Sequence, residues 1–288
     1  MVSIAMAVFN GERHLREQVD SILHQTIPAL EIVVCDDSST DGTWSILLQY
    51  AKEDSRFRIY RNDTNLGFVK NFEKAISLCS GEYIALSDQD DIWTEDHLDL
   101  LLKSIGNKIL SCGNALLVNE NGQSLGITLK EIEQLDYIPE DDFSKLYSIM
   151  LFRNPYQGSS MLFKSELIQK ALPFPHGTSF HDRWLAMVAC LTGGINYVDS
   201  IVLYYRRTHE NITEYIKKRS RFKYCLHGWT NGQAEEIDQL LEQPNVPISK
   251  ANKYVLLKWR KLLAQNTKIR KPITVSYFIS NFRKIYSL

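Results

Sequence analysis

The sequence predicts an α/β fold in which a mainly parallel sheet is covered by helices and followed by a helical C-terminal extension. Through the first hundred residues, segments rich in β-branched residues alternate with segments whose apolar residues recur at helical spacing. The strand-like segments are continuously apolar, as in parallel strands that are buried on both faces. A length of 288 residues suits one large α/β domain with an appendage.

The first part of the chain contains four strand–helix pairs in succession. The expected strands cover residues 2–9, 31–35, 57–60 and 83–86. The expected helices occupy residues 12–26, 44–51, 68–78 and 95–102. Turn-forming residues follow the strands, as in Asn10-Gly11 and DDSSTDGT, so the boundaries between the pairs are well marked.

The pattern loosens after residue 102. We expect strands at residues 109–118, 159–163, 195–198 and 201–205, helices at 165–171 and 181–191, and an acidic loop over 128–145. From residue 215 onward the chain becomes basic and helical. These changes predict an α/β domain over residues 1–214, with halves at 1–120 and 121–214, and a helical extension over residues 215–288.

The net charge of −1 conceals a division between the two parts of the chain. Residues 1–214 hold 18 Lys and Arg against 30 Asp and Glu, whereas residues 215–288 hold 15 against 4. The extension also contains KYVLLKWRKLLAQ, which has the pattern of a basic amphipathic helix. It therefore predicts an anionic partner such as a lipid surface. The alternatives are a merely solvated helical face and a helix that docks its apolar side on the first domain.

The cysteines and the hydropathy of the chain indicate the cellular compartment in which the protein is expected. The five cysteines are scattered without CxxC pairs, and most lie inside apolar runs, which predicts reduced core residues. The N-terminal apolar run lacks the basic flank of a signal peptide, and no run approaches the ~20 residues of a membrane span. We expect a cytoplasmic protein, peripheral at most on the inner face of the cell membrane, and no nucleic-acid partner.

Carboxylates gather after the second and fourth expected strands, in DDSSTDGT and SDQDDIW. Ligands of parallel sheets bind beyond the carboxyl ends of the strands, where both clusters lie. Asp88 and Asp90, on one face of a continuing strand, would form an oxygen site suited to Mg²⁺ or Mn²⁺. Alternatively, Asp91 or Thr94 caps the following helix, and the first cluster forms an ordinary turn.

Three segments carry a resemblance to a known family: AVFNGERHLREQVDSILHQT, EIVVCDDSSTDGT and NLGFVKNFEKAISLCSGEYIALSDQDDIW. In order and spacing they resemble the nucleotide-binding half of glycosyltransferase family 2, whose members have the Rossmann-like GT-A fold. The resemblance covers residues 1–120 and makes residues 121–214 the acceptor-side half. SDQDDIW is also similar, together with FHDRWLAMVA and YYRRTHENIT, to bacterial rhamnosyltransferases of that family.

The resemblance implies a set of donor-binding residues. The end of the first strand would lie against the nucleotide base, Asp37 would contact a uracil or thymine ring, and Asp88 would lie near the ribose. Lys70 stands where the family often has arginine near the diphosphate. The implied donor-binding set is Ala7, Phe9, Asn10, Asp36, Asp37, Asn65, Gly67, Lys70, Asp88, Arg206 and Arg207.

The same resemblance implies a metal site. Asp90 matches the residue that holds a divalent metal on the diphosphate, with Asp88 beside it, and the metal would be Mg²⁺ or Mn²⁺. His209 follows an expected strand, where related enzymes sometimes have a further histidine ligand. Arg206 and Arg207 either hold the diphosphate bidentately or pair with acids of the domain surface.

Asp182 opens the expected helix HDRWLAMVACL and matches the general base of inverting members of the family. The residues alone favour an ordinary first-turn acid of a helix, and the base role comes from the resemblance. The implied acceptor-binding residues are Gln157, Gly158, Ser159 and His181. Without the resemblance, QGSSMLF reads as a plain core strand after a turn.

The resemblance thus implies an inverting, metal-dependent glycosyltransferase. Its donor would be a nucleotide-diphospho sugar, first dTDP-L-rhamnose and alternatively a UDP-hexose or UDP-N-acetylhexosamine. Its acceptor would be a cell-surface polysaccharide or a polyprenyl-diphosphate-linked oligosaccharide. A sugar nucleotidyltransferase would need a Gly-rich, basic loop after the first strand, where AVFNGERHL has one glycine. A non-catalytic binding module would be expected to lack Asp90 or Asp182, and both are present.

Overall fold

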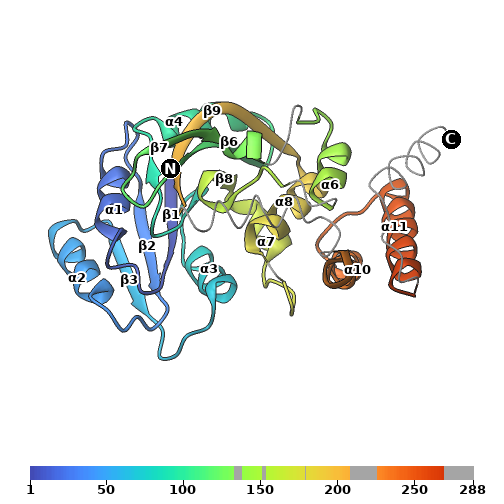
Figure 1. Ribbon diagram of the computed structural model, residues 1–288, viewed down its shortest axis with the longest axis horizontal. Coiled ribbons are helices and arrows are strands. Elements are labelled where there is room, and N and C mark those ends of the chain that lie inside the picture. The colour runs from blue at the N-terminus through green and yellow to red at the C-terminus, as the bar shows by residue number, and fades with distance from the viewer. Residues whose placement is uncertain (133–137, 151–153, 179, 208–225, 269–288) are drawn as a thin grey trace. The chain divides into compact units, whose positions relative to one another are not determined.

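The computed structural model describes residues 1–132, 138–150, 154–178, 180–207 and 226–268. Within these residues, nine strands form one sheet in the order β3-β2-β1-β4-β8-β6-β9-β5, with β7 paired to β6 (Figure 1). The strands are β1 (Val2–Val8), β2 (Glu31–Asp36), β3 (Phe57–Arg61), β4 (Tyr83–Ser87), β5 (Ile92–Trp93), β6 (Leu110–Val118), β7 (Ser124–Thr128), β8 (Met161–Lys164) and β9 (Ile195–Arg206). The expected α/β class is confirmed.

Helices connect these strands. They are α1 (Leu15–Leu23), α2 (Thr43–Glu53), α3 (Phe68–Ser77), α4 (His97–Ile105), α5 (Leu129–Ile132), α6 (Asp142–Met150), α7 (Ile168–Ala171) and α8 (His181–Thr192), with 3₁₀ turns η1 (Gly158–Ser160) and η2 (Ser165–Leu167). α3 packs on β1 and β2, and α4 packs on β6 and β9. Every residue of β1 and β2 is buried, as expected of strands that are covered on both faces.

The sheet changes character between its two halves. β1 pairs in parallel with both β2 and β4, and β2 pairs in parallel with β3. Beyond β4 the sheet is mixed, because β8 runs antiparallel to both β4 and β6. The parallel half brings the carboxyl ends of β1, β2 and β4 to one edge, since Val8 pairs with Asp36 and Met6 with Ser87.

The second half of the chain departs from the expectations in several places. Residues 195–206 form one strand instead of two, because Asp199 and Ser200 bulge out where Gly113 and Asn114 pair with Val198 and Ile201. The acidic segment expected as a loop contains α5 and α6. The short strands β5 and β7 were not expected, since a two-residue strand leaves no periodic signal.

The C-terminal helices belong to a separate compact unit. Residues 1–209 and 244–247 form the first unit, and the second contains α10 (Leu226–Glu242) and α11 (Lys250–Lys268). The two helices pack on each other, and Arg260 pairs with Asp238 through Nε at 2.5 Å. Ile237, Leu240, Leu256 and Trp259 are buried. Among the described residues, every helix is too short or too polar to cross a lipid bilayer.

Candidate active site

Side-chain hydrogen bonds join the segments that follow β1, β2 and β4 at the carboxyl edge of the sheet. Gln89 forms a reciprocal pair with the main chain of Phe9: the Phe9 amide donates to Gln89 Oε1 at 2.7 Å, and Gln89 Nε2 donates to the Phe9 carbonyl at 3.0 Å. A Cβ on Gly11 would lie 2.7 Å from Gln89 Oε1, so a larger residue here would displace the Gln89 side chain. Sequence reasoning missed Gln89, although its position among three carboxylates was a usable signal.

Asp36 and Asp37 are both buried, and their carboxylates interact with other groups of the protein. Asp37 accepts hydrogen bonds from Asn62 Nδ2 at 2.7 Å and from the amides of Leu66 at 2.8 Å and Gly67 at 2.9 Å. Asp36 accepts from the Ser39 hydroxyl and lies 3.2 Å from Arg61 Nε. These contacts shape the turn after β2 and the loop before α3. A contact of Asp37 with a nucleotide base remains a prediction.

Other residues of the implied donor set lie along the same edge. Ala7 is buried in β1, Phe9 is exposed, and Asn10 has a left-handed φ of 48° with its side-chain oxygen accepting from the Thr40 amide at 2.8 Å. Asn65 Oδ1 accepts from the Gly67 amide at 3.0 Å. Gly67 has φ of 80°, a conformation that favours glycine and allows the turn into α3.

The second acidic cluster lies in a loop, not on a strand. β4 ends at Ser87 and β5 starts at Ile92, so the expectation that a strand holds Asp88 and Asp90 on one face is wrong. The Asp91 carboxylate accepts from the Ser159 hydroxyl and from the Arg206 amide at 3.1 Å. Asp91 therefore does not cap a helix; it joins the loop to η1 and to β9.

Asp88 and Asp90 are half-buried in a region of concentrated negative charge. Burial, followed by repulsion from Asp90 and Asp182, raises the pKa of Asp88 to about 7. Burial also raises the pKa of Asp90, against the opposing charges of His14, Arg206 and Arg207. A cation bound here would relieve this repulsion.

Asp88 and Asp90 suit a divalent cation that takes its remaining ligands from a bound substrate and from water. Within the described residues, no three His, Cys, Asp or Glu side chains form a ready-made metal cluster. Mg²⁺, however, is typically held by one or two carboxylates together with substrate phosphates and water. Asp88 and Asp90 fit that arrangement. His209, the third implied ligand, lies outside the described residues.

Arg206 and Arg207 differ in their surroundings. The Arg206 side chain is 4% exposed and pairs through Nη2 with Glu17 at 2.5 Å. Its Nε donates to the Asp90 carbonyl at 2.7 Å, and Nη1 donates to the Glu120 carbonyl at 2.8 Å. Arg206 thus supports the loop of residues 88–91, called the acidic loop from here on. The Arg207 guanidinium lies 4.6 Å from the centre of the Tyr205 ring, and its charge acts on Asp88 and Asp90.

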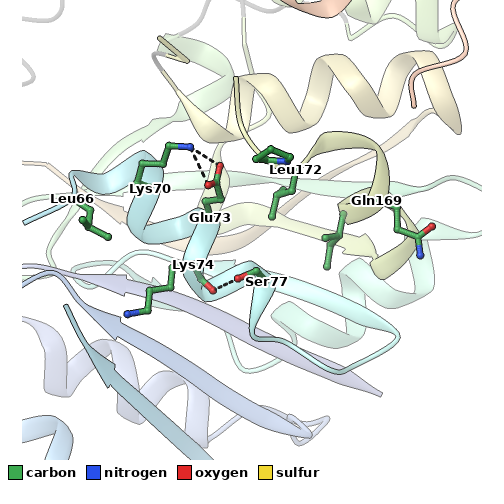
Figure 2. Close-up of a pocket in the computed structure, with 9 residues that line it drawn as sticks. Leu66, Lys70, Glu73, Lys74, Ser77, Gln169 and Leu172 are labelled. Atoms are coloured by element: carbon green, nitrogen blue, oxygen red, sulfur yellow. Dashed lines mark hydrogen bonds and ion pairs between the residues drawn. The ribbon is translucent and has the colours of Figure 1, made fainter. Parts of the chain in front are cut away.

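Lys70 is held by neighbouring protein groups. Its Nζ lies 3.0 Å from Glu73 Oε1 and donates to the Phe174 carbonyl at 3.3 Å. Figure 2 shows this pair in a pocket between α3 and α7 whose lining includes Leu66, Ile168, Leu172 and Pro173. A contact between Lys70 and a diphosphate would require the lysine to leave Glu73.

Asp182, the second residue of α8, is half-buried and directly contacts η1. Its Oδ1 accepts from the Arg183 amide at 2.6 Å, and its Oδ2 accepts from the Gly158 amide at 3.3 Å. Burial raises the pKa of Asp182 to about 6. A partly exposed carboxylate with a raised pKa is suited to accept a proton near neutral pH.

The remaining implied acceptor residues surround Gly158. The His181 ring is buried and stacks on Phe72 with 3.9 Å between ring centres, and burial lowers its pKa to about 3, so the ring is neutral. Within the described residues, neither His181 ring nitrogen has a hydrogen-bond partner, and Gln157 Oε1 also lacks one. A Cβ on Gly158 would lie 2.9 Å from His181 Nε2, which explains the glycine.

The half-parallel sheet with carboxylates at its edge is the architecture of GT-A glycosyltransferases, and solved structures agree. TarS of S. aureus, residues 1–349, aligns with a TM-score of 0.65 at 20% identity, covering 92% of this chain and 72% of that chain. A mannosyltransferase of Pyrobaculum calidifontis, solved with GDP-Man and Mn²⁺, aligns with a TM-score of 0.52 at 16% identity, covering 100% of this chain and 80% of that chain. The expected GT-A fold is confirmed.

The family model described as glycosyl transferase family 2 matches residues 3–163, which is more than half of the chain. The chain belongs to glycosyltransferase family 2. An uncharacterized glycosyltransferase of Haemophilus influenzae is 29% identical over 231 residues, which cover 75% of this chain and 68% of that protein. The E. coli glucosyltransferase WfgD is 32% identical over 123 residues, which cover 42% of this chain and 48% of that protein.

Proposed function

We propose that this glycosyltransferase transfers a sugar, with inversion, from a nucleoside-diphosphate sugar to an acceptor hydroxyl, and that Asp182 is the general base. One observation carries the proposal: two consecutive residues of η1 connect Asp182 with the acidic loop. The Gly158 amide bonds to Asp182, and the Ser159 hydroxyl bonds to Asp91. The base and the acidic loop are therefore held at one place by the same backbone.

In the proposed reaction, the Asp182 carboxylate accepts the proton of the acceptor hydroxyl. The acceptor oxygen forms a bond to the anomeric carbon from the face opposite the leaving group. The bond between that carbon and the diphosphate oxygen breaks, and its electron pair leaves with the nucleoside diphosphate. A divalent cation bound by Asp88 and Asp90 would supply stabilisation of the charge on this leaving group.

For the donor we propose a pyrimidine nucleotide. The Asp37 amide donates to the carbonyl of Val8, the residue before the exposed Phe9, at 2.8 Å, and the Asp37 position matches the base-contacting acid of the family. The name of WfgD specifies UDP-Glc, and TarS has been solved with UDP-GlcNAc. The similarity of FHDRWLAMVA and YYRRTHENIT to rhamnosyltransferases supports dTDP-L-rhamnose as the particular donor. Uracil and thymine nucleotides share the edge that a carboxylate at Asp37 would contact.

For the acceptor we propose a glycan carried on a polyprenyl diphosphate and met at a membrane surface. The acceptor named for WfgD is a GlcNAc-diphosphoundecaprenol. In this chain, α11 contains no Asp or Glu, and its exposed residues include Lys253, Tyr254, Leu257 and Lys261. A helix surface of lysines with an aromatic and a leucine suits an anionic bilayer.

A donor panel tests the proposal. The purified chain is incubated with Mn²⁺ and, in turn, dTDP-L-rhamnose, UDP-Glc and UDP-GlcNAc, and the release of nucleoside diphosphate is followed with and without a lipid-diphosphate N-acetylhexosamine. We expect one donor to be consumed faster when acceptor is present, and Asp182→Asn to abolish that increase. Consumption of none of the donors by the wild-type protein would contradict the proposed function.

A further inference from the structure

Two exposed phenylalanines lie side by side where α3 and α8 begin. Phe68 is 52% exposed and Phe180 is 56% exposed, although phenylalanine is usually buried. Their ring centres are 6.3 Å apart, with an angle of 43° between the ring planes. Single exposed apolar residues need no explanation, but an adjacent pair brought together from distant parts of the chain indicates a binding surface.

Buried groups position the Phe68 ring and the backbone of Phe180. Phe68 contacts the His181 ring in an edge-on arrangement with 6.1 Å between ring centres, and His181 in turn stacks on Phe72. The Phe180 carbonyl accepts from the Trp184 amide at 3.2 Å in the first turn of α8. The Phe68 ring therefore rests on a buried ring before any ligand arrives, which lowers the entropic cost of ordering it on binding.

The position of the pair relates it to the candidate base. Phe180 precedes Asp182 by two residues, and His181, between them, packs against Gly158, whose amide bonds to Asp182. In the proposed reaction the acceptor hydroxyl must reach the Asp182 carboxylate. The sugar ring that bears this hydroxyl must then lie next to the start of α8.

The chemistry of the pair suits a sugar ring. A pyranose has a face of C–H groups bordered by hydroxyls, and the partly negative face of an aromatic ring attracts such C–H groups. A lipid chain would instead be expected to need a long apolar surface, whereas Lys70 and Asp182 lie on the same two elements as these rings.

We propose that Phe68 and Phe180 form a platform on which the acceptor's sugar ring stacks while its hydroxyl meets Asp182. This inference rests on the proposed function and identifies the acceptor-side residues that select a pyranose ring. It predicts that the platform acts on the acceptor and leaves the donor unaffected.

The test compares steady-state constants for Phe68→Ala and Phe180→Ala with the acceptor varied at saturating donor. From the usual strength of aromatic stacking, we expect the acceptor KM to rise by about 3–10-fold in each variant. Donor KM and acceptor-free donor hydrolysis are expected to stay at the wild-type values. Phe180→Tyr should retain the wild-type KM, and Phe180→Leu should not. Leu48→Ala, at a leucine of α2 that is 49% exposed, is the matched surface control.

Each other result has a distinct meaning. An unchanged acceptor KM in both alanine variants overturns the platform, and so does a rise in donor KM in its place, which would assign the rings to the donor sugar. Full activity of Phe180→Leu would reduce the contact to a plain apolar one, such as a lipid chain, and also overturns the platform. Absence of donor consumption in the wild-type protein overturns the proposed function itself, so the two failures are distinguishable.

Discussion

Arg206 Nε donates a hydrogen bond to the carbonyl oxygen of Asp90 at 2.7 Å, across 116 residues of sequence. The last residue of β9 therefore holds the loop that carries the proposed metal ligands. The same guanidinium pairs with Glu17 and reaches the turn after β6 through the Glu120 carbonyl. Because the Arg206 side chain is buried, its bonds to the two carbonyls are shielded from water and fix the backbone of the loop, whereas the Glu17 side chain is 51% exposed.

Replacing Arg206 by lysine should loosen this loop. Lysine cannot reproduce the planar fork of donors, so at least two of the contacts would be lost. We expect Arg206→Lys to lower the free energy of unfolding by about 1–3 kcal/mol, measured by urea denaturation. We also expect Mn²⁺ to bind about tenfold more weakly in the presence of UDP, as expected for a residue that supports metal ligands.

Arg13→Lys is the matched control for Arg206→Lys. Arg13 also lies beside Glu120, at 2.8 Å, but its side chain is 65% exposed. Exposed ion pairs contribute little, so this variant should resemble the wild-type protein in both measurements. Equal Mn²⁺ affinity in Arg206→Lys and Arg13→Lys would show that the acidic loop keeps its shape without Arg206.

Asp90 and Asp91 should behave differently when they are truncated, although they are neighbours. Asp90→Ala should abolish the Mn²⁺-dependent part of the thermal shift that UDP produces, because Asp90 is a proposed ligand. Asp91→Ala should lower the free energy of unfolding by about 1–3 kcal/mol, because the Ser159 hydroxyl and the Arg206 amide lose their acceptor. Retention of the Mn²⁺-dependent shift in Asp90→Ala would remove Asp90 from the metal site.

The protonation of Asp182 should set the acid limb of the pH–rate profile. Only the deprotonated carboxylate can accept a proton, and burial raises its pKa to about 6. Transfer should therefore be lost as the pH falls through about 6, by tenfold for each further unit. Asp182→Asn should lower kcat by about 10²–10⁴-fold while UDP binding, measured by calorimetry, stays intact. Near-normal transfer by this variant would exclude Asp182 as the base.

His97 should make the protein less stable in acid. Its ring is buried, stacks on Trp93 with 3.8 Å between ring centres, and bonds to the Val202 carbonyl through Nδ1 at 2.8 Å. Burial lowers the pKa of His97 to about 3, well below the usual value of about 6.5 for histidine. The unfolded chain takes up a proton that the folded protein excludes, so the contribution of this group to stability falls as the pH drops from about 6.5 towards 3.

The variant His97→Phe keeps the ring stack and removes the titration. At pH 7 it should be less stable than the wild-type protein by about 1 kcal/mol, for the lost hydrogen bond. At pH 5 the difference should vanish or reverse, because protonation of the unfolded histidine costs the wild-type protein about 2 kcal/mol there. Urea denaturation at both pH values, with the exposed His24→Gln as control, measures this change. An equal difference at pH 7 and pH 5 would contradict the assignment.

Gly11 and Gln89 should be energetically coupled. A Cβ at residue 11 would displace the Gln89 side chain, which then loses both hydrogen bonds to Phe9. We expect Gly11→Ala and Gln89→Ala each to cost about 1–2 kcal/mol in the free energy of unfolding, and the double variant to cost little more than either. Additive costs in this double-mutant cycle would show that Gly11 is not there to admit Gln89.

Several elements were predictable because their signals are local. The strands β1 to β4 and the helices between them have periodic apolar patterns, and each begins or ends within a few residues of its expected limit. The continuous strand β9 was not predictable, because its two halves are joined only by pairing with β6 through a bulge. The same holds for β5, whose two residues form a strand only against Leu203 and Tyr204.

The sequence by itself determined the α/β class, the edge of the sheet at which the carboxylates gather, and the residue types available there, since these follow from periodicity and from the order of strands. Only the tertiary structure decided how each of these side chains is used. Asp91 and Arg206 hold the acidic loop in place by hydrogen bonds. Asp182 bonds to the Gly158 amide, and the next residue, Ser159, bonds to Asp91 of that loop. The physical reason is that burial and hydrogen bonding depend on partners from distant segments, which no local pattern records.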